Sequence, residues 1–345
     1  MTNMTGQTNT WMIQEVASPR LDAPVPVVGA LDVPTAPGAN RFQTVDLYLP
    51  LTTGTQELVG SPVRPFLGSL LASEHPATLV HVHGGAWRDP HLTGRSIEAT
   101  VAHAFRDDGG SIRAVASLNY SISPFPTHPT DPYEPGSIGQ LDPAREAVHP
   151  DHLRDVLQGI RFLRTLGLAD RSYILSGHSA GACLSFQAAL LGPEAFGLDP
   201  DLTPPTPAAL YGVNGLYDLP NLVDRPGSTH EHVAAEYENL LSHAFGDRSR
   251  WSGASPARLD SEAIRYRLER GLVPPARSAR PERVGPARAD EPTRDDAGGP
   301  PQRPGAAHGA KPARRGPARY AVGGRADALD RGSRRRPHPW GIMNR

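Results

Sequence analysis

The chain has 345 residues, a formal net charge of −1 at pH 7 and a single cysteine. The balanced charge gives no overall basic field that would indicate binding to nucleic acid or to an anionic membrane. The cysteine count excludes an internal disulfide framework, and no apolar run approaches the length of a membrane-spanning helix. Because the N-terminal residues lack the pattern of a signal peptide, we expect a soluble protein in the cytoplasm.

The first predicted elements are strands. Residues 1–40 are rich in proline, glycine, threonine and alanine, so we expect an irregular N-terminal arm with one short strand near Trp11–Val16. An incomplete domain is expected over residues 41–270. Short apolar or alternating segments that end at proline, glycine or serine predict its first strands. These strands are expected over Phe42–Leu49, Ala77–His83 and Ile112–Tyr120.

The middle of the domain alternates helices with strands. The proline-rich connection over residues 124–150 is interpreted as a lid, since long connections in compact domains are usually functional. Apolar residues at helical spacing predict a helix that Asp151 caps and Gly167 ends. The later elements are a strand from Tyr173, a helix to about Gly192, a strand over Ala208–Val213 and a helix over Val233–Phe245. This order predicts an α/β fold with an open, largely parallel sheet flanked by helices.

The composition changes in the last part of the chain. Residues 271–345 are dominated by arginine, proline, glycine and alanine, which cannot bury enough apolar surface to offset their ordering entropy, so disorder is predicted. GC-rich codons give the same residue types in a wrong reading frame, and Lys311 is the only lysine of the chain. We therefore hypothesise a wrong reading frame or exon boundary from about residue 260–275, with the last strands and helix of the domain missing. An uninterrupted transcript read through this region, in the same frame, would exclude the hypothesis.

A Gly-x-Ser-x-Gly pentapeptide lies between an apolar, strand-like run and a small-residue segment that can begin a helix. It spans residues 177–181, with Ser179 at its centre. This is the setting of a nucleophile elbow, in which glycines let the strand and helix backbones approach closely around a sharp turn. Ser179 is therefore the candidate nucleophile. A plain glycine and serine turn before a helix remains the alternative interpretation of the pentapeptide alone.

A second motif ends a predicted strand upstream of Ser179. It consists of His83, Gly84, Gly85, Ala86 and Trp87. A serine hydrolase needs hydrogen-bond donors for the tetrahedral oxyanion, and glycines let a loop aim the N–H groups of Gly84 or Gly85 at a substrate oxygen. The N–H of Ala180, at the start of the next helix, is expected to be a second donor. The two motifs together predict a hydrolase.

The two motifs resemble those of the kynurenine formamidase family of α/β-hydrolases, whose HGGxW motif matches residues 83–87. Further segments that resemble fungal members are Trp87–Pro90, Leu118–Ser121, His149–Val156 and Gly215–Leu219. The resemblance, over roughly residues 40–258, implies an α/β-hydrolase fold and hydrolysis of N-formyl-L-kynurenine to L-kynurenine and formate, in tryptophan degradation towards NAD.

The same resemblance implies the roles of the site residues and the kind of partner. It makes Ser179 the nucleophile and assigns Gly84 and Gly85 to the oxyanion hole. It implies a small-molecule substrate, no metal or other cofactor, and no nucleic-acid or membrane partner. Whether the protein forms a homodimer is left open.

The chain departs from the family where the catalytic acid and base belong. In the family the aspartate follows a later strand and the histidine lies near the C-terminus, in the region that here is rich in arginine and proline. Asp218 follows a predicted strand, but we interpret it as a turn-stabilising residue, and His308 as incidental. The triad acid and base are therefore unassigned. The alternatives are a carboxylesterase of broader specificity, or an inactive hydrolase-like remnant or binding module.

The remaining histidines predict no metal site. His81 and His83 alternate on one strand, and the pair at residues 230 and 232 lacks a third convergent ligand. His178 is expected to point away from Ser179 across the turn and not to be its base.

Overall fold

A computed structural model of the chain describes residues 10–63, 78–106, 111–137, 141–227, 230–262 and 264–265. These residues all lie in one of two compact units, Met1–Arg280. The disorder predicted for residues 271–345 concerns a part of the chain outside the described residues, as does His308, and the reading-frame error proposed from about residue 260–275 stays a hypothesis.

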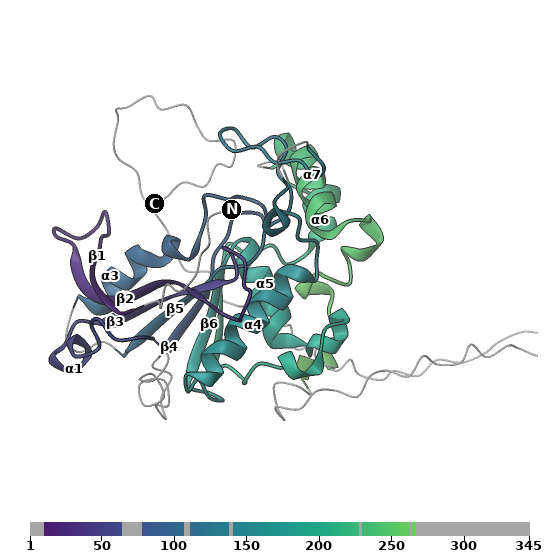
Figure 1. The fold of residues 1–345 in the computed structure, drawn as a ribbon. Helices are drawn as coiled ribbons and strands as arrows, with labels where there is room; N and C mark the ends of the chain where they lie inside the picture. Colours follow the sequence, from purple (N-terminus) through teal and green to yellow (C-terminus); the bar gives the residue numbers. More distant parts are fainter. Residues whose placement is uncertain are drawn as a thin grey trace, which may run out of the picture. The chain divides into compact units, whose positions relative to one another are not determined.

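The described residues contain one mixed sheet of seven strands, in the order β1-β2-β3-β5-β4-β6-β7 (Figure 1). The strands are β1 (Met12–Val16), β2 (Val25–Pro34), β3 (Thr44–Pro50), β4 (Thr78–Val82), β5 (Ala114–Leu118), β6 (Tyr173–His178) and β7 (Ala209–Val213). The pairs β1·β2, β2·β3 and β3·β5 are antiparallel, whereas β5, β4, β6 and β7 run parallel. This confirms the predicted α/β fold with a mostly parallel sheet.

Helices flank the sheet. They are α1 (Thr53–Gln56), α3 (Glu98–Phe105), α4 (Asp151–Thr165), α5 (Ala180–Leu190), α6 (Leu219–Asp224) and α7 (Ala234–Phe245). In α5 nearly every residue is buried, and this helix packs against β6 and β7 and beside α4. The prediction that Asp151 caps α4 was wrong. Pro150 occupies the cap position, and the Asp151 carboxylate in the first turn pairs with Arg154.

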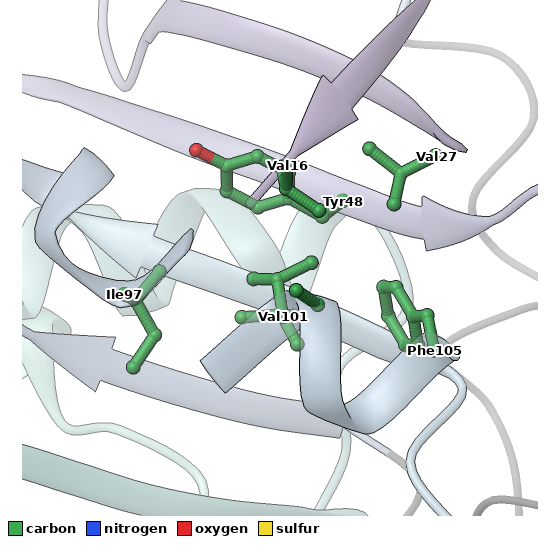
Figure 2. Packing of buried hydrophobic residues seen from close by; sticks show 8 residues of the cluster. Val16, Val27, Tyr48, Ile97, Val101 and Phe105 are labelled. Atoms are coloured by element: carbon green, nitrogen blue, oxygen red, sulfur yellow. The ribbon is translucent and has the colours of Figure 1, made fainter. Parts of the chain in front are cut away.

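The N-terminal part of the chain contributes to the core, which the expectation of an irregular arm missed. Residues Val16 of β1 and Val27 of β2 are buried against Tyr48 of β3 and Val101 of α3 (Figure 2). The signal for β2 was obscured because two prolines and Gly29 lie within it, residue types that are rare inside strands. The helix α3 was also not predicted, since it is short and buries only three side chains.

The two edges of the sheet differ in their exposure to solvent. At one end α3 covers β1, β2 and β3. At the other end β7 pairs with β6, and among the described residues no further strand follows it. The Tyr211 side chain on β7 is 63% exposed.

The core role of β2 is testable by replacing Val27, which is fully buried, with alanine. Removing two buried methyl groups and leaving a cavity is expected to lower the free energy of unfolding by about 2 kcal/mol. Chemical denaturation followed by circular dichroism measures the change. The control is Val59→Ala, because the Val59 side chain is 40% exposed and should cost little. Equal stabilities of the two variants would contradict the placement of β2 in the core.

Candidate active site

Ser179 lies on the turn that joins β6 to α5, with backbone angles φ 52° and ψ −118°. A residue with a side chain rarely adopts positive φ, and a nucleophile elbow is a strained turn of this kind. The flanking glycines permit it. A Cβ atom on Gly177 would lie 2.3 Å from the carbonyl oxygen of Gly181, and one on Gly181 would lie 2.2 Å from that of Val82. Only glycine fits at both positions.

Ser179 is half-buried. The backbone N–H of Ser179 donates to the carbonyl oxygen of Val213 at 2.9 Å and so ties the elbow to the end of β7. No hydrogen bond joins the Ser179 hydroxyl to any residue that the structure describes. His178 is half-buried beside it, and burial lowers the pKa of its imidazole. Ser179 is therefore a candidate nucleophile on the grounds of its backbone geometry.

The glycine-rich loop over residues 83–87 lies next to the elbow. The parallel strands β4 and β6 are neighbours, with Val82 opposite Gly177, so the loops that follow them meet at one edge of the sheet. A Cβ atom on Gly84 would lie 3.3 Å from the Cβ of Ser179 and 2.7 Å from Nδ1 of His178. The structure thus brings together the two motifs that the sequence singled out.

The loop has an unusual backbone. Gly85, Ala86 and Trp87 follow one another with φ values of 101°, 51° and 59°, all in the left-handed region. The N–H groups of Arg88 and Asp89 then both donate to the carbonyl oxygen of Gly85 at 2.9 Å and close the turn. Such strain persists only where the surrounding structure fixes it, and it is common at functional sites.

Three backbone N–H groups are candidate oxyanion donors. The N–H groups of Gly84, Gly85 and Ala180 donate no hydrogen bond to a described residue. Ala180 is the first residue of α5, where N–H groups have no partner within the helix and the helix dipole favours negative charge. A tetrahedral oxyanion formed at Ser179 is the group that these donors would stabilise.

Trp87 and Arg88 fasten the loop to α7, and both side chains are fully buried. The Trp87 ring packs edge-on against Phe245 with a centroid separation of 4.9 Å. The Arg88 guanidinium pairs with Glu236 and donates to Oδ1 of Asn239 at 2.7 Å. Burial lowers the pKa of Arg88, and the Glu236 carboxylate opposes this shift. A buried arginine without its partner would be costly, so this ion pair holds α7 close to the loop.

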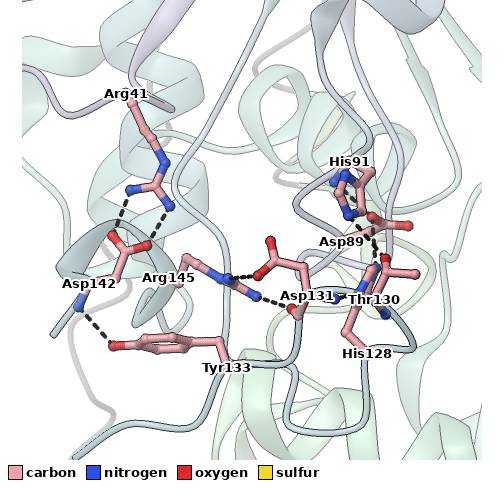
Figure 3. Close-up of polar contacts among 9 residues, drawn as sticks. All are labelled: Arg41, Asp89, His91, His128, Thr130, Asp131, Tyr133, Asp142 and Arg145. Carbon is pink, nitrogen blue, oxygen red and sulfur yellow. Dashed lines mark hydrogen bonds and ion pairs between the residues drawn. The ribbon is translucent and has the colours of Figure 1, made fainter. Parts of the chain in front are cut away.

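The proline-rich connection predicted as a lid packs against the same loop. The Ser123 N–H donates to the carbonyl oxygen of Trp87 at 2.7 Å, and Phe125 lies 3.9 Å from the Arg88 guanidinium. Polar contacts hold the rest of the described connection in place (Figure 3). They join Arg145 to Asp131, Arg41 to Asp142, Tyr133 to Asp142 and Glu146, and His128 to Asp89. Its motion as a lid stays a prediction.

The carboxylate of Asp218 stabilises the local fold at the start of α6. It accepts hydrogen bonds from Nδ2 of Asn221 at 2.7 Å and from Nε of Arg258 at 2.6 Å, and it caps α6. These contacts agree with the interpretation of Asp218 as a turn-stabilising residue. Within the part of the chain that the structure describes, no histidine or carboxylate contacts the Ser179 hydroxyl. The acid and the base stay unassigned.

The described residues also contain no group of three or more histidine, cysteine, aspartate or glutamate side chains that could hold a metal ion. His81 instead has its Nδ1 within 3.0 Å of the Ser176 hydroxyl, and burial lowers its pKa to about 3. Among the helices described, none has both the length and the apolar character that crossing a membrane requires.

A nucleophile elbow on a mostly parallel sheet, with a glycine loop after the neighbouring strand, defines an α/β-hydrolase, and this is the fold of the chain. Its curated relatives are kynurenine formamidases and a kynurenine formamidase-like hydrolase. The chain is 34% identical over 225 residues to that hydrolase of Fusarium equiseti, covering 64% of this chain and 65% of the relative. It is 34% identical over 199 residues to a kynurenine formamidase of Aspergillus versicolor, covering 53% and 63%.

The chain spans slightly less than two thirds of the length of these two relatives. No family model matches it. Among solved structures, esterase B of Lactobacillus rhamnosis is 18% identical with a TM-score of 0.45, over 67% of this chain and 62% of the esterase.

The steric requirement at the elbow is testable at Gly181. A Gly181→Ala substitution would place a methyl group against the carbonyl groups at the end of β4, so we expect a loss of about 1–3 kcal/mol in the free energy of unfolding. Displacement of α5 should also slow the reaction of Ser179 with a fluorophosphonate probe. The control is Gly54→Ala, because nothing lies within 4 Å of a Cβ built at Gly54. Unchanged stability and labelling of Gly181→Ala would contradict the observed close approach.

Proposed function

We propose that this chain is a serine hydrolase that cleaves the formamide of N-formyl-L-kynurenine to L-kynurenine and formate, in tryptophan degradation towards NAD. The observation that carries the proposal is Ser179 on a strained elbow beside the loop of residues 83–87. The choice of substrate is supported by the names of the relatives, two of which are 34% identical to this chain.

The proposed reaction begins at the Ser179 hydroxyl. Oγ of Ser179 attacks the formyl carbon, and the carbonyl oxygen becomes an oxyanion that accepts hydrogen bonds from Gly85 and Ala180. Each such donor typically lowers the barrier by about 3 kcal/mol. The C–N bond then breaks, and the amine takes up a proton and leaves as L-kynurenine. Water hydrolyses the formyl ester of Ser179 to formate and restores the hydroxyl.

Proton transfer is the step that the described residues do not supply. A base must take the Ser179 proton, and an acidic partner normally orients that base. This observation favours a second candidate function, a non-catalytic hydrolase-like protein that binds small molecules. If the chain is an enzyme, the alternative to a formamidase is a carboxylesterase of broader specificity. The small-molecule substrate follows from the relatives, while homodimer formation and a cytoplasmic location stay predictions.

Substrate preference is tested by comparing N-formyl-L-kynurenine with p-nitrophenyl acetate as substrates of the full chain. We expect turnover of the formamide, and a loss of at least about a thousandfold in kcat for Ser179→Ala. The matched control is Ser185→Ala, because Ser185 is a fully buried serine of α5 whose hydroxyl donates to the Ser176 carbonyl. Ester hydrolysis without formamide turnover would replace the proposal by a carboxylesterase.

A fluorophosphonate probe separates the catalytic from the non-catalytic candidate. The probe reacts with an activated serine, so the proposal expects labelling of the wild type and of Ser185→Ala but not of Ser179→Ala. Mass spectrometry of the labelled peptide locates the adduct. A folded wild-type protein that stays unlabelled would establish the non-catalytic candidate.

A further inference from the structure

We infer that Tyr120 is a positioning residue of the oxyanion hole, whose hydroxyl fixes the Gly84–Gly85 peptide and thereby aims the Gly85 N–H. The inference rests on the proposed function, because it assigns a role within the same site. Tyr120 lies beyond the end of β5, in the segment Leu118–Ser121, to which the sequence assigned no role.

Strand register places Tyr120 beside the glycine loop. The strands β4 and β5 are parallel neighbours, with Val82 opposite Leu118. Gly84 lies two residues after Val82, and Tyr120 lies two residues after Leu118, so the two residues leave the same edge of the sheet. The Tyr120 ring stacks on the His83 imidazole, with centroids 4.4 Å apart and an angle of 11° between the planes. Both side chains are buried.

Two side chains donate to a single carbonyl group. The Tyr120 hydroxyl donates to the carbonyl oxygen of Gly84 at 3.0 Å and also lies 3.2 Å from that of His83. Nδ1 of His83 lies 2.8 Å from the same Gly84 oxygen. A carbonyl oxygen only accepts, so Nδ1 carries the proton.

The protonation states favour this arrangement at neutral pH. Burial raises the pKa of the Tyr120 phenol, so the hydroxyl keeps its proton and donates. Burial lowers the pKa of His83 to about 4, so the imidazole is neutral. A neutral imidazole with its proton on Nδ1 has no charge to attract water into the packed loop.

The peptide plane transmits this contact to the oxyanion hole. A trans peptide is planar, so the C=O of Gly84 and the N–H of Gly85 point in opposite directions. Holding the carbonyl against Tyr120 and His83 therefore directs the Gly85 N–H away from both. That N–H donates to no described residue and is left for a substrate oxygen.

The backbone alone would not hold this orientation. Gly84 and Gly85 have no Cβ atoms, and glycine adopts many backbone conformations at little cost. Side chains are nonetheless disfavoured at both positions, since a Cβ on Gly84 would lie 2.7 Å from Nδ1 of His178 and Gly85 has a φ of 101°. Because Gly84 and Gly85 carry no side chains, hydrogen bonds from other residues must fix the peptide plane between them.

Tyr173 offers a matched control. It is a fully buried tyrosine at the start of β6, and its hydroxyl donates to the carbonyl oxygen of Pro205 at 2.6 Å. Replacing either tyrosine with phenylalanine removes one buried hydroxyl and leaves one buried carbonyl without that donor. The two variants should lose similar thermal stability, but only Tyr120→Phe alters a group next to the candidate nucleophile.

The test compares Tyr120→Phe and Tyr173→Phe with the wild type. For Tyr120→Phe we expect an approximately tenfold lower rate constant for fluorophosphonate labelling of Ser179. We expect a similar fall in kcat, with KM within about twofold, because the oxyanion forms after the substrate binds. Tyr173→Phe should keep wild-type rates. Wild-type rates in Tyr120→Phe, or equal losses in both variants, would overturn the inference.

The same experiment separates this inference from the proposed function. If the wild type hydrolyses p-nitrophenyl acetate but not N-formyl-L-kynurenine, the proposed substrate is wrong. The kcat of Tyr120→Phe is then compared with that of the wild type on p-nitrophenyl acetate. If the wild type does not react with the probe at all, the proposed activity fails and a crystal structure of Tyr120→Phe decides. A rotated Gly84–Gly85 peptide in that structure supports the inference, and an unmoved peptide overturns it.

Discussion

The close approach of β6, α5 and the end of β4 is the constraint on which the candidate site depends. The backbone of α5 at Gly181 lies so near the carbonyl groups of Val82 and His83 that no side chain fits between them. This contact brings the start of α5, which follows Ser179, next to the loop that follows β4. Without it the two motifs would be separate turns, since neither contains both the nucleophile and a complete set of donors.

Near this contact, buried polar groups hold the loop of residues 83–87, whose two glycines have little intrinsic preference for one backbone conformation. Tyr120, which follows the neighbouring strand β5, and His83, the first residue of the loop, both donate to the Gly84 carbonyl, and Arg88 joins the loop to α7. Each is a desolvated group that is stable only when partnered, so its partner is held in turn. Precision at the site is therefore provided by residues that take no part in the chemistry themselves.

The sequence predicts the elements whose signals are local and misses those that depend on distant contacts. The apolar periodicity of α4 and the run before Ser179 identified their elements, and the glycine spacing identified both halves of the site. In contrast, β2 contains two prolines and is stabilised by pairing with β1 and β3. The link from Arg88 to Glu236 and the place of Tyr120 follow from packing and strand register, which no short segment specifies.

The three left-handed residues at 85–87 make the loop conformation depend on the packing around it. Non-glycine residues at positive φ each cost on the order of 1–3 kcal/mol, so Ala86 and Trp87 keep their conformation only while their neighbours stay packed. Trp87 and Arg88 are buried against α7, so loosening of that helix would release the strain and let the loop change its backbone conformation.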